Sequence, residues 1–316
     1  MKRNRAVARA ALLALAASLV SPIGVLWLVS VPLGLALVAL RWGERWPTAG
    51  AGVLLGSASL YALAVALVGG GDAPLRFAEL GWCLLVGGAF VAASASGTGR
   101  TLMDRTLIAV GGAGGVVLVI GLLRPGLVSG LDWAKGAEIR QTAAAAYTWL
   151  AANGGAWVER FGAAMLDWVA FQEAVYPAFL ALGSLAALGV AGLLGEGPRR
   201  RVAPGRIRDF RFSDQLVWIL VAGLALLVLP LGRSAARVGE NATLFMGVLY
   251  LVRGGAVLWW IAASVVTSAG TGVLLALLAM LLYPVVAGTA LVVGLSDTWL
   301  DLRGRMRRSE AEDGAP

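Results

Sequence analysis

The stretch GVLLALLAMLLYPVVAGTALVVG, from Gly272 to Gly294, contains no charged residue. A helix needs about 20 mostly apolar residues to cross roughly 30 Å of hydrocarbon, so this stretch is long enough to span a bilayer. Comparable stretches recur along the 316 residues, of which 59% are hydrophobic and 14% are charged, and the mean hydropathy is +0.81. The sequence therefore predicts an all-α fold, a polytopic transmembrane helical bundle with about nine membrane segments.

Short polar gaps separate this stretch from the other apolar segments and those segments from one another. The expected segments cover about residues 6–21, 23–41, 48–68, 78–96, 106–123, 173–194, 214–232, 241–267 and 271–295. A basic N-terminus precedes the first one, and a cleaved signal peptide is the less favoured alternative, because Ala14-Leu15-Ala16 only loosely resembles a cleavage site. The apolar run resumes directly after Ser21-Pro22, which favours a tight turn between two retained spans.

Arginines in the polar gaps set the expected orientation. Glu196–Arg211 is the most arginine-rich gap, and the positive-inside rule places it in the cytoplasm of a bacterium, together with the N-terminus. The tail Arg303–Arg308 favours the same side, yet nine spans would place it outside. A break in segment 241–267 beside Arg253 and Gly254-Gly255 would resolve this conflict, and charge alone leaves the side of the C-terminus open.

These boundaries suggest four parts. They are a six-span core at 1–195, a basic cytoplasmic loop at 196–212, C-terminal membrane segments at 213–296 and a polar tail at 297–316. Within the core, residues 124–172 form an extracytoplasmic insert with large apolar side chains at helical spacing, and Gly154-Gly155 is expected to separate two helices. Such amphipathic helices commonly lie in the membrane interface, and a lid over a pocket is the alternative.

Several chemistries are excluded by residue types that the chain lacks. It has no histidine and no GxxxxGK(S/T) loop, so histidine-based catalysis and a P-loop of its own are ruled out. The single Cys83 excludes a disulfide framework within one chain. We expect no enzyme, no cofactor and no metal site. The net charge of +8 lies in the short polar gaps, which indicates membrane topology and not nucleic-acid binding.

Arg253 is the main candidate for a functional residue, because an arginine inside a membrane segment is costly unless it faces a partner or a cavity. A structural ion pair is an equally good interpretation. The possible counter-charges are Asp72, Glu79, Asp167, Glu173 and Glu240. Asp297 and Asp301 are spaced i,i+4 and are expected to form a solvated helix face, with a cation site as the alternative.

Several local patterns together resemble one family. The second segment ends in Leu40-Arg41-Trp42-Gly43, Arg206–Phe212 precedes Trp218, Asn241 is followed by Leu251–Ala256, and the chain closes with Gly294–Arg303. In these features the sequence resembles, over nearly its whole length, the YybS-like family of bacterial membrane proteins, catalogued as domain of unknown function 2232.

That family looks distantly related to the S components of energy-coupling-factor transporters. The resemblance implies docking on a coupling membrane subunit with an ATPase, through small residues of the first helix. Ala6, Ala10 and Ala14 would supply such a face here, and ordinary packing within the protein is the alternative.

The resemblance and the topology predict a protein that binds, or helps to transport, a small molecule in the manner of an S component. Its pocket would open outward beneath the insert. The candidate ligand-binding residues are Trp133, Tyr147, Trp157, Trp168, Glu173 and Arg253. The alternative function is a non-transporting scaffold or assembly factor for cell-envelope or division machinery.

Overall fold

The computed structural model describes residues 46–68, 73–95, 101–154, 157–195, 212–265 and 268–300. The elements in these ranges are all helical, so the all-α prediction is confirmed for this part of the chain. The chain divides into two compact units, Met1–Arg201 and Val202–Pro316.

Four of the described helices are long and apolar enough to cross a membrane, or up to five when one bent pair counts as a single span. The expectation of about nine segments is therefore met only in part. The first two expected segments, 6–21 and 23–41, lie outside the described residues, and so do Ala6, Ala10 and Ala14.

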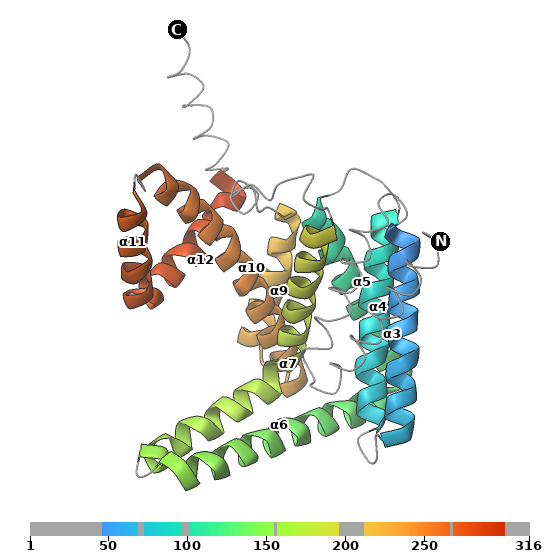
Figure 1. The fold of residues 1–316 in the computed structure, drawn as a ribbon. Helices are drawn as coiled ribbons and strands as arrows, with labels where there is room; N and C mark the ends of the chain where they lie inside the picture. Colours follow the sequence, from blue (N-terminus) through green and yellow to red (C-terminus); the bar gives the residue numbers. More distant parts are fainter. Residues whose placement is uncertain are drawn as a thin grey trace. The chain divides into compact units, whose positions relative to one another are not determined.

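The first unit contains five described helices, shown in blue to yellow-green in Figure 1. They are α3 (Trp46–Val68), α4 (Ala73–Ala95), α5 (Leu102–Leu123), α6 (Pro125–Gly154) and α7 (Trp157–Gly195). The helix α4 packs against both α3 and α5, and α5 also packs against α7. Between α3 and α4, apolar side chains such as Val53, Leu54 and Tyr61 are buried with Leu80 and Cys83.

The insert expected at 124–172 is a helical hairpin whose second helix does not stop at residue 172. The helix α6 ends at Gly154, as expected, whereas α7 runs on without interruption to Gly195 and so joins the insert to the sixth expected segment. In Figure 1, α6 leaves the ends of α3 and α4 at a steep angle, and the first half of α7 returns beside it before changing direction.

Pro177 lies inside α7, where it removes a backbone hydrogen bond, and proline is the commonest cause of such a change in helix direction. We call residues 125–176, which comprise α6 and the part of α7 before Pro177, the arm.

The second unit begins with the short helix η4 (Asp214–Leu216). It is followed by α9 (Val217–Val228), α10 (Arg233–Val265), α11 (Ala269–Leu281) and α12 (Tyr283–Leu300). The helices α9 and α10 touch along their backbones, since a Cβ atom added at Gly239 would lie 2.7 Å from the carbonyl oxygen of Gly223. Gly232, with φ of +93°, makes the turn between them in a conformation that suits glycine.

The break that the charge pattern suggested near Arg253 does not occur there, because α10 is continuous from Arg233 to Val265. The break lies instead in the ninth expected segment, 271–295, where α11 and α12 are bent by 94°. Pro284 follows this bend directly. Its ring lacks the N–H that a continuing helix needs and restricts the residue before it, so one straight helix is disfavoured at this point.

Candidate functional site

Arg253 lies at the centre of a buried polar cluster in the second unit. Its Nε donates to Oδ2 of Asp297 over 2.9 Å, and its Nη2 donates to the backbone carbonyl of the same residue over 3.2 Å. Its Nη1 donates to Oδ1 of Asp214 over 2.8 Å. The guanidinium carbon also lies 5.3 Å from the ring centre of Phe212, which is close enough for a cation–π contact.

Both Arg253 and Asp297 are buried, with 0% and 1% of their surfaces exposed. Burial of the arginine agrees with expectation, but its partners are not among the counter-charges considered. The expectation of a solvated face for Asp297 was wrong, because this side chain turns inward to meet the arginine. The helix α12 continues to Leu300, and Asp301 lies outside the described residues.

Two glycines bring the arginine and its carboxylate together. A Cβ atom at Gly254 would overlap the carbonyl of Ala290, and one at Gly294 would overlap the carbonyl of Tyr250. The backbones of α10 and α12 are therefore in direct contact beside Arg253, as small residues allow for packed membrane helices. A glycine within one helical turn of a charged residue, on each of two apolar helices, was the signal that could have linked these segments in the sequence.

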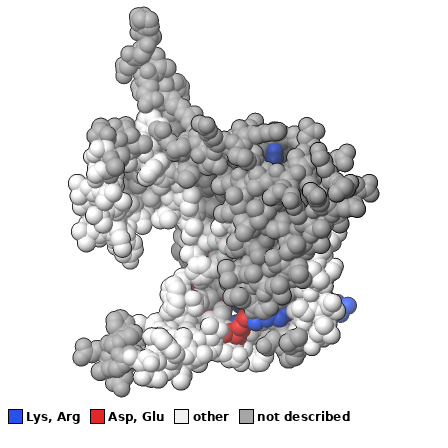
Figure 2. Space-filling model, viewed as in Figure 1, with Lys and Arg blue, Asp and Glu red and all other residues white. Residues whose placement is uncertain are grey.

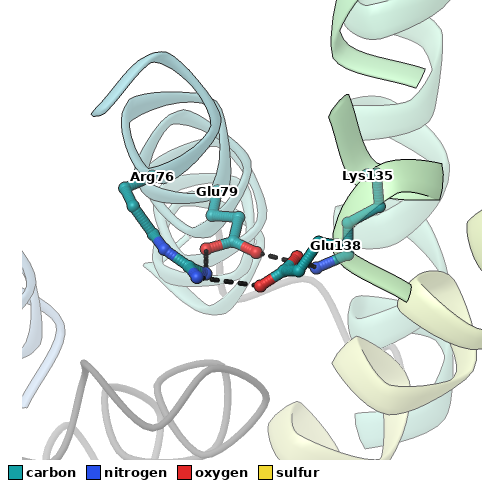
Figure 3. Close-up of polar contacts among 4 residues, drawn as sticks. All are labelled: Arg76, Glu79, Lys135 and Glu138. Atoms are coloured by element: carbon teal, nitrogen blue, oxygen red, sulfur yellow. Dashed lines mark hydrogen bonds and ion pairs between the residues drawn. The ribbon is translucent and has the colours of Figure 1, made fainter. Parts of the chain in front are cut away.

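A second charged cluster joins α4 to α6 in the first unit, and we call it the ion ring (Figure 3). Arg76 contacts Glu79 over 2.9 Å and Glu138 over 2.8 Å. Lys135 contacts the same two carboxylates over 3.0 and 2.6 Å. Positive and negative groups alternate around this closed ring, so each charge touches two opposite charges and the ring is neutral.

The ion ring is partly buried, and this strengthens its electrostatics. Burial alone would lower the pKa of Lys135, but hydrogen bonds to Glu138 and Glu79 and the charges of both carboxylates outweigh it, and the pKa is raised. Burial would likewise raise the pKa of Glu138, yet Lys135 and Arg76 lower it overall. The ion ring thus stabilises the charged forms of both Lys135 and Glu138.

One further ion pair fixes the two helices of the arm to each other, between Arg140 Nη1 and Glu173 Oε2 over 2.7 Å. On the face seen in Figure 2, acidic and basic side chains gather where α6 meets the rest of the first unit. The base of the arm is therefore held by charge pairs on two sides, to α4 and to α7.

The structure describes five of the six candidate ligand-binding side chains, four on the arm and one in the second unit. Trp133, Tyr147 and Trp168 are 72%, 37% and 52% exposed, and Trp133 and Tyr147 are 14 positions apart on the single helix α6, which separates them by about 21 Å along its axis. Glu173 is committed to Arg140. Arg253 belongs to the second unit, and the side chain of Trp157 lies outside the described part.

Comparison with protein families gives a match over nearly the whole chain. A family model described as a predicted membrane protein (DUF2232) matches residues 8–298, which is nearly the whole chain. This agrees with the family resemblance drawn from the sequence, while the distant likeness to S components stays a prediction. No curated protein and no solved structure matches the chain.

Proposed function

The chain belongs to the DUF2232 family of membrane proteins, and from that premise we propose that it is a non-enzymatic membrane scaffold whose arm binds a second protein of the cell envelope. In this proposal the protein lies in the cytoplasmic membrane of a bacterium with its N-terminus inside. The arm then lies on the outer side of the membrane. The distribution of arginines between Glu196–Arg211 and the arm supports this orientation.

The exposed indole of Trp133 is the observation that carries the proposal. Trp133 and Lys135 are two residues apart on α6, so their side chains point in nearly opposite directions, about 200° apart around the helix. Lys135 faces α4 through its contact with Glu79. Trp133 therefore points away from α4, with 72% of its surface exposed. Tryptophan is enriched among the residues that dominate protein–protein binding.

The ion pairs at the base of the arm support the same function. The ion ring fixes α6 to α4, and the pair of Arg140 and Glu173 fixes α6 to α7. A binding element that is already held in one conformation loses less entropy when a partner binds, and it binds more tightly for the same contacts. The arm thus has the properties of a preorganised docking element.

Site-specific photo-crosslinking in intact cells tests the proposal. A photoreactive amino acid at position 133 of the full-length protein is expected to give an adduct with one defined envelope protein, identified by mass spectrometry. The matched control is position 118, where Leu118 is 66% exposed on the apolar helix α5 and should contact lipid only. Adducts at 133 that contain only lipid, or none at all, would contradict the scaffold.

Small-molecule binding in the manner of an S component stays a prediction. Its pocket would need residues 6–41, which lie outside the described part of the chain, and two of its candidate residues, Trp133 and Tyr147, are about 21 Å apart along α6. Purification in mild detergent separates the two functions. A co-purifying ATPase or a retained metabolite would favour transport, whereas envelope proteins alone would favour the scaffold.

A further inference from the structure

We propose that α6 lies in the headgroup layer of the bilayer and that Trp149 anchors it there by contact with phospholipid. The lipid that Trp149 contacts is on the side of the membrane where α4 begins and α5 ends. The inference does not depend on the scaffold function, because it concerns a different face of α6.

Two membrane-spanning helices fix the depth of α6. Arg76 and Glu79 lie three and six residues after the start of α4 at Ala73, or about 5 and 9 Å along its axis, and both contact α6. The helix α5 ends at Leu123, and α6 begins at Pro125. The base of the arm therefore lies beside α4 at the level where α4 and α5 meet the membrane surface.

The helical repeat of α6 determines what faces the lipid. Leu127, Glu138 and Trp149 follow one another at intervals of 11 residues, which is close to three helical turns of about 3.6 residues each, so they share one face. Glu138 on this face contacts Arg76 of α4. Trp149 lies about 16 Å further along the same face, beyond this contact. Trp149 is exposed there and lies near the level at which the candidate spans α4 and α5 end, so in this proposal it meets the lipid surface.

Exposure along this face agrees with a lipid boundary. Leu122 and Leu123 at the end of α5 are 76% and 73% exposed, and the apolar surface continues onto α6 through Leu127, which is 54% exposed. Trp149 itself is 67% exposed. Large exposed apolar side chains next to spanning helices are where lipid chains and headgroups pack.

The chemistry of this part of α6 suits the headgroup layer. No charged residue occurs from Gln141 to Gly154, so nothing there opposes contact with the membrane. The charges nearer to α4 are neutralised within the ion ring. An indole combines a large apolar ring with one N–H donor, and tryptophan is accordingly enriched where hydrocarbon meets headgroups.

Electron paramagnetic resonance of spin-labelled protein tests the anchor. Single cysteines replace Trp149, Trp133 and Leu118 in full-length protein carrying Cys83→Ala, reconstituted in vesicles of phosphatidylethanolamine and phosphatidylglycerol. A label at 118 is the reference for the hydrocarbon, and a label at 133, on the opposite face of α6, is the reference for the side of α6 turned away from α4. We expect the label at 149 to lie between them, with at least threefold more collision with oxygen, relative to a water-soluble nickel complex, than the label at 133.

An accessibility at 149 equal to that at 133 would overturn the proposal, and so would a label at 149 that neither reagent reaches, because it would then be covered by protein. Unlabelled Trp149→Phe protein provides a check on folding, since phenylalanine keeps the apolar ring. Its melting temperature should match that of the wild type. Failure of crosslinking from position 133 would remove the scaffold function and leave this result unaffected.

Discussion

Arg253 and Asp297, 44 residues apart in the sequence, are joined by a buried ion pair of 2.9 Å between Nε and Oδ2. The same guanidinium reaches Asp214, just before α9, over 2.8 Å. Asp297 lies three residues before the end of α12 at Leu300. One side chain therefore holds the start of α9 and the end of α12 at the same depth.

This relationship predicts the side of the C-terminus. The chain enters α9 at the level of Arg253 and leaves α12 at that level, so α11 and α12, bent by 94°, would form a hairpin that returns to its side of origin. The arginine-rich tail would then share the cytoplasmic side with Glu196–Arg211, as the positive-inside rule requires.

Cysteine labelling checks this topology in a Cys83→Ala background. Cysteines at positions 203 and 310 should both resist a membrane-impermeant maleimide in intact cells and react once the cells are opened. A cysteine replacing Asn153 on the arm should react from outside. If the maleimide labels the cysteine at 310 in intact cells but not the cysteine at 203, then α11 and α12 together cross the membrane once.

Replacement of Arg253 by leucine should destabilise the second unit strongly. The substitution leaves Asp297 buried without its cation, and breaking a buried ion pair in this way costs on the order of 3–5 kcal/mol. Arg253→Lys keeps the charge but cannot reproduce the forked contacts, so it should cost less. The measurement is thermal unfolding in detergent, with Arg233→Leu at the exposed start of α10 as control. Equal unfolding temperatures for Arg253→Leu and this control would contradict a structural role for the cluster.

The sequence predicted those features of the fold that depend on local residue patterns. Long apolar stretches indicated the helices, and the cost of an intramembrane charge indicated that Arg253 is buried. Its partner could not be found in this way, because the pairing depends on where α10 crosses α12. The bend beside Leu282 was missed because Pro284 sits in an otherwise uninterrupted apolar run, which composition alone interprets as one span.

The arm, too, could be predicted from the sequence only in part. Its helical character and its break at Gly154 followed from the sequence, whereas the continuity of α7 through residue 172 did not. The ion ring was also missed, since Glu79 was considered only as a possible partner of Arg253. Its four charges come from helices whose contact the sequence does not reveal.

Adding one methyl group at the crossing of α10 and α12 should separate Arg253 from its partner. Gly254→Ala places a Cβ atom against the carbonyl of Ala290, where there is no room for it. Gly255→Ala is a matched control, because nothing lies within 4 Å of its added Cβ and alanine is the better helix former. We expect a loss of several degrees in melting temperature for the first variant and no loss for the second. Similar losses in both would show that the two backbones are not in contact.

The ion ring is expected to stabilise the folded protein at intermediate pH and to lose this contribution at both low and high pH. The pKa of Glu138 is lower in the folded protein than in the unfolded chain, so its contribution is full above its unfolded pKa of about 4.3 and is lost as the pH falls through the folded value. The pKa of Lys135 is raised, so its contribution is full below its unfolded pKa of about 10.4 and is lost as the pH rises through the folded value. The ring should therefore stabilise the arm most between about pH 5 and 9.

Glu138→Gln measures this contribution, because it removes the charge and keeps the shape of the side chain. The difference in unfolding free energy between wild type and variant should be about 1 kcal/mol on the plateau. It should shrink at acid pH, where the protonated carboxyl resembles the amide, and again at strongly alkaline pH, where Lys135 becomes neutral. The control is Asp167→Asn on the exposed surface of the arm, which should show little difference at any pH. A difference for Glu138→Gln that stays constant from pH 3 to pH 11 would mean that the ring charges do not hold α6 to α4.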